Sequence, residues 1–101
     1  MTRTLATALL LPAALVGCGD SSPGRIQGTW QAQGVMPMKV VFREGETETM
    51  GLIEEVGYSD QGDAVLITYK DGMMKGSSVR WRMLDEETAQ ALGLTYKKVS
   101  N

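Results

Sequence analysis

Few residues in this chain could carry chemistry. Its 101 residues include no histidine and a single cysteine, Cys18. Ser-His-Asp and Cys-His catalysis need an imidazole as general base, and structural zinc sites need several histidine or cysteine ligands. The sequence also lacks the glycine-rich loops that cradle nucleotide phosphates. We therefore expect a protein that is not an enzyme and that holds no metal or organic cofactor.

The carboxylates offer two weaker candidate sites. Glu54 and Glu55 are adjacent, and adjacent strand residues point to opposite faces, so they cannot flank one bond unless a bulge turns one of them. Glu44, Glu46 and Glu48 alternate around a turn and could hold a divalent cation loosely. We expect solvated carboxylates in both places.

Methionine is the unusual feature of the composition, with seven in the chain. Thioethers are soft ligands that suit Cu(I). The candidates for a copper site are Met36, Met38, Met73 and Met74. The alternative is that methionine fills gaps in an apolar core. The alternation around Met38, Met50 and Met83 favours this second interpretation.

The N-terminus has the features of an export signal. Arg3 precedes an apolar run over residues 5–16, which is the order of charged and apolar regions in a signal peptide. Twelve helical residues rise only about 18 Å, too little to cross a bilayer core of roughly 30 Å. Pro12 within the run also argues against a spanning helix. The sequence predicts a signal peptide over residues 1–17.

The end of this run is more specific. Leu15, Val16 and Gly17 precede Cys18, a pattern that resembles the lipobox of bacterial lipoproteins. In that family the cysteine sulfur receives a diacylglycerol and the signal is removed in front of it. The resemblance implies a covalent lipid such as palmitate on Cys18. It also implies a location on the periplasmic side of the inner or outer membrane, or at the cell surface.

The rest of the chain divides into a tether and one domain. Residues 18–25 are small and polar, which predicts a lipidated cysteine followed by a flexible tether. Residues 26–101 suffice for a single small domain. Without the leader, nine basic residues face twelve acidic ones, a net charge of −3. This balance argues against a nucleic-acid partner. The expected partners are the membrane, through the lipid, and an unidentified envelope protein.

From residue 26 onward, apolar and polar residues alternate with a period of two, which is typical of half-buried antiparallel strands. Turn signals such as Asp71-Gly72 separate the strands. The sequence predicts a mainly β fold, a small antiparallel meander or half-barrel of about six strands. We expect burial of Trp30, Phe42, Val65, Ile67, Trp81 and Met83, and exposure of Lys39, Arg43, Arg80 and Arg82.

Two segments depart from simple alternation. One register places Met50, Leu52, Val56 and Tyr58 on a single face but turns Glu54 inward, and a β-bulge near residues 53–55 would resolve this conflict. Residues 86–92 are compatible with one short helix, because Asp85 could cap its start and Gly93 its end.

Two short motifs resemble the lipocalin-like domains found among small bacterial lipoproteins. They are Gly28-Thr29-Trp30 at the first strand and the basic closing strand around Lys97 and Lys98. The resemblance implies that Trp30 plugs one end of a barrel and that Lys97 or Lys98 packs over its ring as a cation–π contact. Trp81 is expected to be a second structural residue, in the core.

These expectations lead to one function class and two alternatives. The first is a non-catalytic accessory or interaction module of the cell envelope, anchored to the membrane by lipid. The second is a lipocalin-like carrier of a small apolar ligand, which requires a hollow interior. The third is a copper-binding lipoprotein built on methionine.

Overall fold

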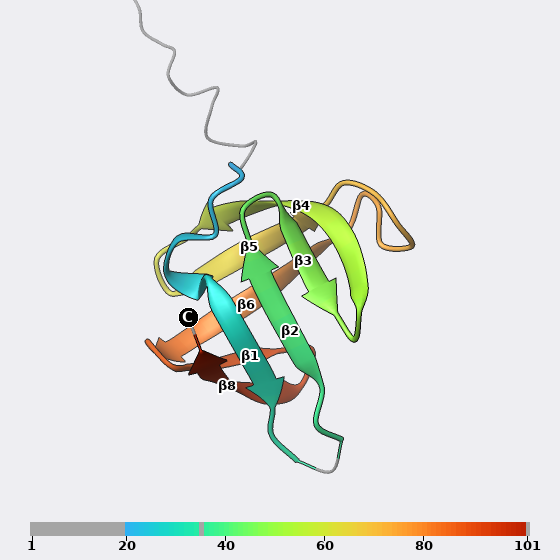
Figure 1. Ribbon diagram of the computed structural model, residues 1–101. Helices are drawn as coiled ribbons and strands as arrows, with labels where there is room; N and C mark the ends of the chain where they lie inside the picture. Colours follow the sequence, from blue (N-terminus) through green and yellow to red (C-terminus); the bar gives the residue numbers. More distant parts are fainter. Residues whose placement is uncertain (1–19, 35, 101) are drawn as a thin grey trace, which may run out of the picture.

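Alternating residues form strands along most of the chain that the computed structural model describes, residues 20–34 and 36–100 (Figure 1). The strands are β1 (Gly28–Ala32), β2 (Lys39–Arg43), β3 (Glu46–Thr49), β4 (Leu52–Asp60), β5 (Ala64–Tyr69), β6 (Ser78–Asp85), β7 (Thr88–Ala91) and β8 (Leu94–Ser100). Each strand pairs antiparallel with the next one, and β8 returns to pair with β1. The mainly β, antiparallel prediction is confirmed, and the sheet closes into an eight-stranded barrel.

The predicted half-barrel of about six strands was wrong because two strands were overlooked. These are β3 and β7, with only four residues each. The first was interpreted as a hairpin tip and the second as part of a helix. Two-residue connections at positions 44–45, 50–51, 86–87 and 92–93 leave enough chain for eight strands. Closure also removes the unpaired edges that a half-barrel would leave exposed.

The short helix predicted over residues 86–92 is absent, and β7 occupies most of that segment. The signals that suggested a helix serve two turns instead. The carboxylate of Asp85 accepts a hydrogen bond of 2.8 Å from the backbone N–H of Glu87, which lowers the pKa of Asp85. Leu92 and Gly93 both have positive φ, as a type I′ hairpin turn requires. An aspartate before a segment and a glycine after it are compatible with either structure.

Within β4 the expected bulge near residues 53–55 is also absent, since the pairing with β3 and β5 runs without a shift. Glu54 lies on the inner face with Val56 and Tyr58, whereas Ile53 is exposed. Met50, expected on the inner face, belongs to the turn before the strand and is 71% exposed. The strand β4 keeps a regular pleat, and as a result the carboxylate of Glu54 lies inside the barrel.

Aromatic rings fill the barrel. The Trp81 ring centre lies 4.3 Å from that of Tyr96, 4.8 Å from that of Phe42 and 6.0 Å from that of Trp30. Of the six residues predicted to be buried, five are 3% exposed or less, and Met83 packs against them half-buried. Lys39, Arg80 and Arg82 are exposed as predicted, while Arg43 is half-exposed and paired with Glu46 and Glu48.

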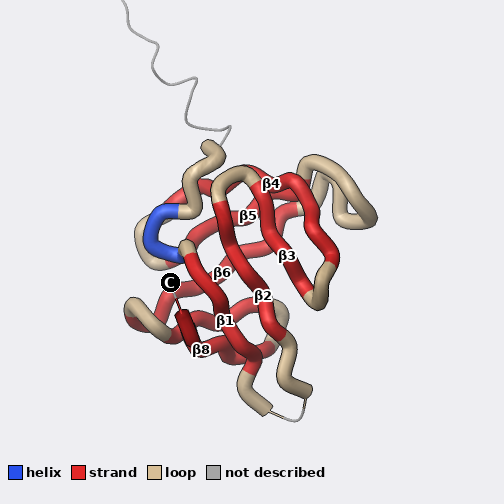
Figure 2. Tube along the Cα trace, viewed as in Figure 1, coloured by secondary structure: helices blue, strands red, loops and turns tan. Residues whose placement is uncertain are grey.

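The only helical turn among the described residues is the 3₁₀ turn η2 (Gly24–Ile26), which leads into β1 (Figure 2). Ile26 is fully buried, and its carbonyl accepts a hydrogen bond of 2.9 Å from Nε1 of Trp30. Lys98 places its Nζ 5.5 Å from the centre of the Trp30 ring. The cation–π contact that the lipocalin resemblance implies between Trp30 and a basic residue of the last strand is therefore present, and Lys98 makes it.

Candidate functional site

The two ends of the barrel differ in character. Because every pair of neighbours is antiparallel, the connections alternate between the ends. One end holds residues 20–27, 44–45, 61–63 and 86–87, and we call it the polar end. The other holds the loops over residues 33–38, 50–51, 70–77 and 92–93. In Figure 1 these loops lie along the lower and right-hand sides of the barrel, away from the start of the described chain.

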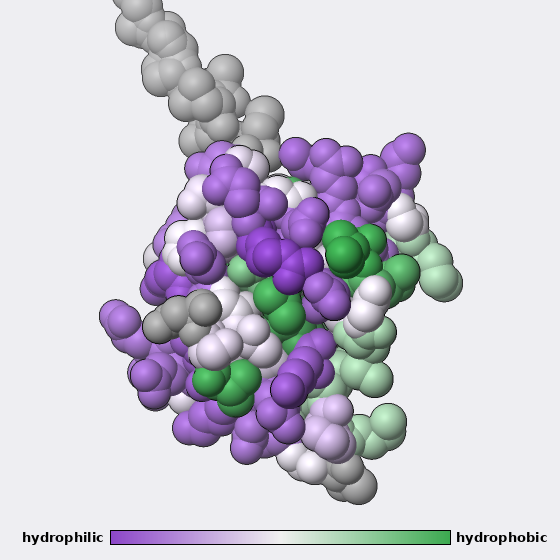
Figure 3. All heavy atoms as spheres, viewed as in Figure 1, coloured by the Kyte–Doolittle hydropathy of each residue, from purple (hydrophilic) through white to green (hydrophobic). Residues whose placement is uncertain are grey.

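Exposed large hydrophobic residues concentrate at the second end. Ten occur among the described residues, and eight of them lie in these four loops or within two residues of them. They are Met36, Met50, Leu52, Ile53, Met73, Met74, Leu92 and Leu94, and together they form what we call the apolar end. Figure 3 shows the hydrophobic residues along this side, whereas the polar end is covered by hydrophilic ones. Each of the four loops contributes at least one such residue.

Two of these residues occupy unfavourable backbone conformations. Met50 and Leu92 have φ of 54° and 53°, and they are 71% and 74% exposed. Each takes the first position of a two-residue turn, where asparagine, aspartate or glycine is normally preferred. A non-glycine residue with left-handed φ pays about 1–2 kcal/mol in steric strain. Neither packing nor turn geometry explains a large apolar side chain at either position.

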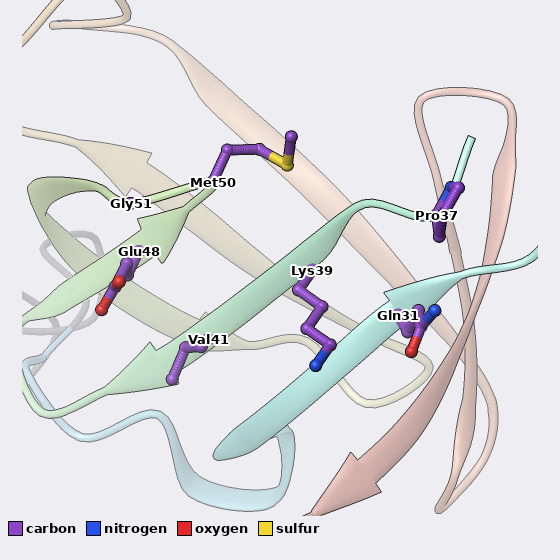
Figure 4. A pocket seen from close by; sticks show the side chains of 7 residues that line it. All are labelled: Gln31, Pro37, Lys39, Val41, Glu48, Met50 and Gly51. Atoms are coloured by element: carbon purple, nitrogen blue, oxygen red, sulfur yellow. The ribbon is translucent and has the colours of Figure 1, made fainter.

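A cleft of about 550 Å³ adjoins the apolar end on the outer face of β1, β2 and β3. The lining residues are Gln31, Pro37, Lys39, Val41, Glu48, Met50 and Gly51. Figure 4 shows Met50 at the end of β3 and Pro37 on the loop before β2, with Lys39 of β2 between them and Glu48 of β3 on the other side of Met50. The apolar surface thus continues from the loop tips into a groove with one basic and one acidic side chain.

A buried carboxylate lies next to the apolar end. Glu54 is 8% exposed, points inward and stands opposite the fully buried Thr47. Its Oε2 lies so close to Gly72, in the β5–β6 loop, that a Cβ at that position would collide with it. Burial raises the pKa of Tyr69, and the negative charge of Glu54 raises it further. Glu54 thus has the inward position that regular alternation predicts, without the bulge that was expected to avoid it.

The polar end receives the start of the described chain. Asp20 exchanges two backbone hydrogen bonds with Tyr58, of 2.8 and 2.7 Å, and the carbonyl of Ser21 accepts one from Gly45. Arg25 forms an ion pair of 3.1 Å with Asp60. Residues 18–25 were expected to form a flexible tether, and from Asp20 onward this segment is held against the barrel. Cys18 itself lies outside the described residues.

The structure does not bring the four candidate copper ligands together. Met36 and Met38 belong to the β1–β2 connection, whereas Met73 and Met74 belong to the β5–β6 connection. In a ring of eight strands these two hairpins lie on opposite sides of the barrel (Figure 1). Met38 packs against the core, and Met73 is 96% exposed. Core packing, the alternative interpretation, holds for Met38 and Met83 and fails for Met50.

The three glutamates considered as a cation site form hydrogen bonds with neighbouring side chains instead. Arg43 donates to Glu46 at 3.1 Å and to Glu48 at 2.8 Å, and Glu44 accepts a hydrogen bond from Ser21. Within residues 20–34 and 36–100, no group of three or more acidic or cysteine side chains is arranged to hold a metal ion. Glu54 and Glu55 point to opposite faces, as predicted for neighbours on a strand.

Of the two lysines that were candidates for packing over Trp30, only one does so. Lys97 donates to the hydroxyl of Thr88 at 3.2 Å, whereas Lys98 packs over Trp30. Trp81 is 3% exposed and lies in the core, as expected. Sequence reasoning missed the apolar end as a site, although methionine at turn positions beside glycine was the available signal.

Comparisons with protein-family models, with curated proteins and with solved structures find no match to this chain. In the part of the chain that the structure describes, no helix has the length and apolar character needed to span a bilayer.

Proposed function

We propose that this protein is a lipid-anchored module of the bacterial cell envelope that acts by binding another envelope protein at its apolar end and performs no catalysis. The observation that carries the proposal is the opposition of the two ends. The described chain begins at the polar end, at Asp20 beside Tyr58, while eight of the ten exposed large hydrophobic residues among the described ones lie at the far end.

The proposed anchor fixes the direction in which the barrel faces. Cys18 precedes Asp20 by two residues, a span of at most about 7 Å. The nine residues of β4 alone extend about 26 Å between the two ends of the barrel. A lipid on Cys18 would therefore hold the polar end against the membrane and direct the apolar end away from it. Under this arrangement a protein is the fitting occupant of the apolar end.

The turn conformations support a binding role for the same residues. Met50 and Leu92 are strained and exposed, although less costly residues exist for both positions. Strain that persists at exposed positions points to a function that compensates for it. Exposed methionine also suits a binding surface, because its flexible side chain adapts to a partner.

A carrier function is the second candidate, since an eight-stranded barrel is the architecture that lipocalin-like carriers use. The interior of this barrel argues against it. Trp30, Phe42, Trp81 and Tyr96 are all 3% exposed or less, and the other three ring centres lie 4.3–6.0 Å from that of Trp81. These rings occupy the volume that a ligand would need.

Photo-crosslinking in living cells tests the proposal. A photoreactive amino acid is placed at Met73, in the apolar end, and at Gln61, an exposed residue of the polar end, as the matched control. We expect one discrete adduct from position 73 that disappears when Met50→Asn and Leu92→Asn are introduced together, and none from position 61. Adducts from position 61 alone, or an adduct from 73 that ignores the double substitution, would contradict the proposal.

A further inference from the structure

Glu54 has no partner for its charge among the described residues. Its side chain points into the barrel and is more than nine-tenths buried. No basic group of the described chain lies within ion-pair distance of its carboxylate; the ion pairs of the barrel join Arg25 to Asp60, Arg80 to Asp63, and Arg43 to Glu46 and Glu48. Buried charges are normally paired, because removal from water is costly.

The place of Glu54 connects it with the apolar end. Gly72 rests against the carboxylate, and the next two residues of that loop, Met73 and Met74, belong to the apolar end. Leu52 and Ile53, two further members, immediately precede Glu54 on β4. A partner that covers these residues therefore comes within side-chain reach of Glu54.

The surroundings favour an organic cation over a metal ion. A calcium ion takes six to eight oxygen ligands, whereas Glu54 is a single carboxylate and no cluster of acids is present in the described residues. Tyr69 pairs with Val56, two residues beyond Glu54 on the same face of β4, and its pKa is raised by burial and further by the charge of Glu54. One aromatic ring and one carboxylate together suit an ammonium or guanidinium group on an apolar stem.

We propose that the apolar end recognises its protein partner through one basic side chain, lysine or arginine, which pairs with Glu54 while apolar residues beside it pack on the surrounding loop tips. This inference rests on the proposed function and names the chemistry of the partner. The buried carboxylate supplies selectivity, because a partner without the basic residue would seal an unpaired charge from water.

Methionine methyl groups provide reporters for the test. The full chain, held in lipid nanodiscs and labelled with ¹³C at its methionine methyls, is titrated with hexylguanidinium and with hexylurea. The two compounds share an apolar stem and a planar head and differ in charge. We expect the signals of Met73 and Met74 to respond, and hexylguanidinium to bind about tenfold more tightly, the usual size of a charge-assisted contact.

Two variants assign the preference to one carboxylate. Glu54→Gln should bring the affinity ratio of the two compounds to about one while hexylurea still binds. Glu55→Gln changes the exposed neighbour on the opposite face and should leave the ratio unchanged. Equal affinities in the unsubstituted chain, binding of neither compound, or a ratio that survives Glu54→Gln would overturn the inference.

The ligand titration tests recognition by Glu54, and the crosslinking experiment tests docking, so the two ideas can fail independently. If the crosslink from position 73 forms as expected but no preference for the cation is seen, docking stands and recognition by Glu54 falls. If the preference is seen but no crosslink forms, Glu54 is a cation site without a role in docking.

Discussion

Lys98 lies over Trp30, with its Nζ 5.5 Å from the centre of the indole ring, where the last strand of the barrel pairs with the first. The two residues stand directly opposite each other in the register of β1 and β8. Trp30 also donates to the carbonyl of Ile26 and is fully buried. Trp30 thus packs beside the β1–β8 pairing that closes the barrel and is held there by contacts to both β8 and the turn before β1.

Truncating the Trp30 side chain should strongly destabilise the folded protein. Trp30→Ala removes a buried aromatic ring from the core, and changes of this kind cost about 3–5 kcal/mol. A small domain has little stability to lose, so we expect the variant to be largely unfolded at room temperature. Chemical denaturation followed by near-ultraviolet circular dichroism measures the effect. Lys98→Met, which keeps an apolar stem over the ring, should cost about 1 kcal/mol or less. A cooperative transition shifted by only a few degrees in Trp30→Ala would show that the residue is peripheral.

Substitution at a strained turn should separate stability from binding. Leu92→Asn replaces a left-handed leucine with a residue that tolerates this conformation, and we expect a gain of about 1 kcal/mol. The same change should weaken the crosslink from position 73. Leu94→Asn, two residues further on in β8, is the control, because it removes exposed apolar surface without relieving turn strain. Urea denaturation of both variants decides the matter, and a loss of stability in Leu92→Asn would refute the strain argument.

The raised pKa of Tyr58 predicts that the folded protein loses stability at alkaline pH. Burial raises the pKa of its hydroxyl, which donates to the backbone carbonyls of Arg43 and Glu46. The unfolded chain releases this proton above a pH of about 10, whereas the folded chain retains it. The contribution of Tyr58 is therefore complete below pH 10 and declines as the pH rises further.

Urea denaturation at a series of pH values from 8 to 11 tests this expectation. Tyr58→Phe should be less stable than the unsubstituted chain at pH 8 and should lose less stability between pH 10 and 11. In Tyr58→Phe the free energy of unfolding should fall less steeply with pH but should still fall, because burial also raises the pKa of Tyr69 and of Tyr96. Parallel curves for the two proteins would exclude Tyr58 as a source of the alkaline sensitivity.

The lipid anchor can be tested by itself. Cys18→Ser removes the sulfur on which the predicted diacylglycerol would be placed, so the chain should neither be processed nor incorporate radioactive palmitate. Labelling with palmitate in cells, followed by gel electrophoresis, measures both properties. If the Cys18→Ser chain still incorporates palmitate, the lipid is attached to another residue. In that case the anchor at Cys18 on which the proposed function relies would be wrong.

The apolar and polar faces of the strands were predictable, because side chains alternate along a strand whatever the topology. Trp30, Phe42, Ile67 and Trp81 were placed inside on this basis, and each is 3% exposed or less. The same rule failed at Glu54, where a charged residue in an inward position suggested a bulge. A local pattern cannot show that the neighbouring loop will cover the carboxylate, since Gly72 lies eighteen residues away in the sequence.

The sequence by itself determined the β character of this protein, the identity of its core and the cysteine of its candidate anchor, since these depend on residue type and on spacing within a few positions. The tertiary structure alone decided that four loops with exposed methionine and leucine meet at one end, opposite Asp20. That meeting depends on the number of strands and on closure of the barrel. Both follow from backbone pairing between β1 and β8, whose residues are nearly seventy positions apart, and a short-range pattern does not encode such a distance.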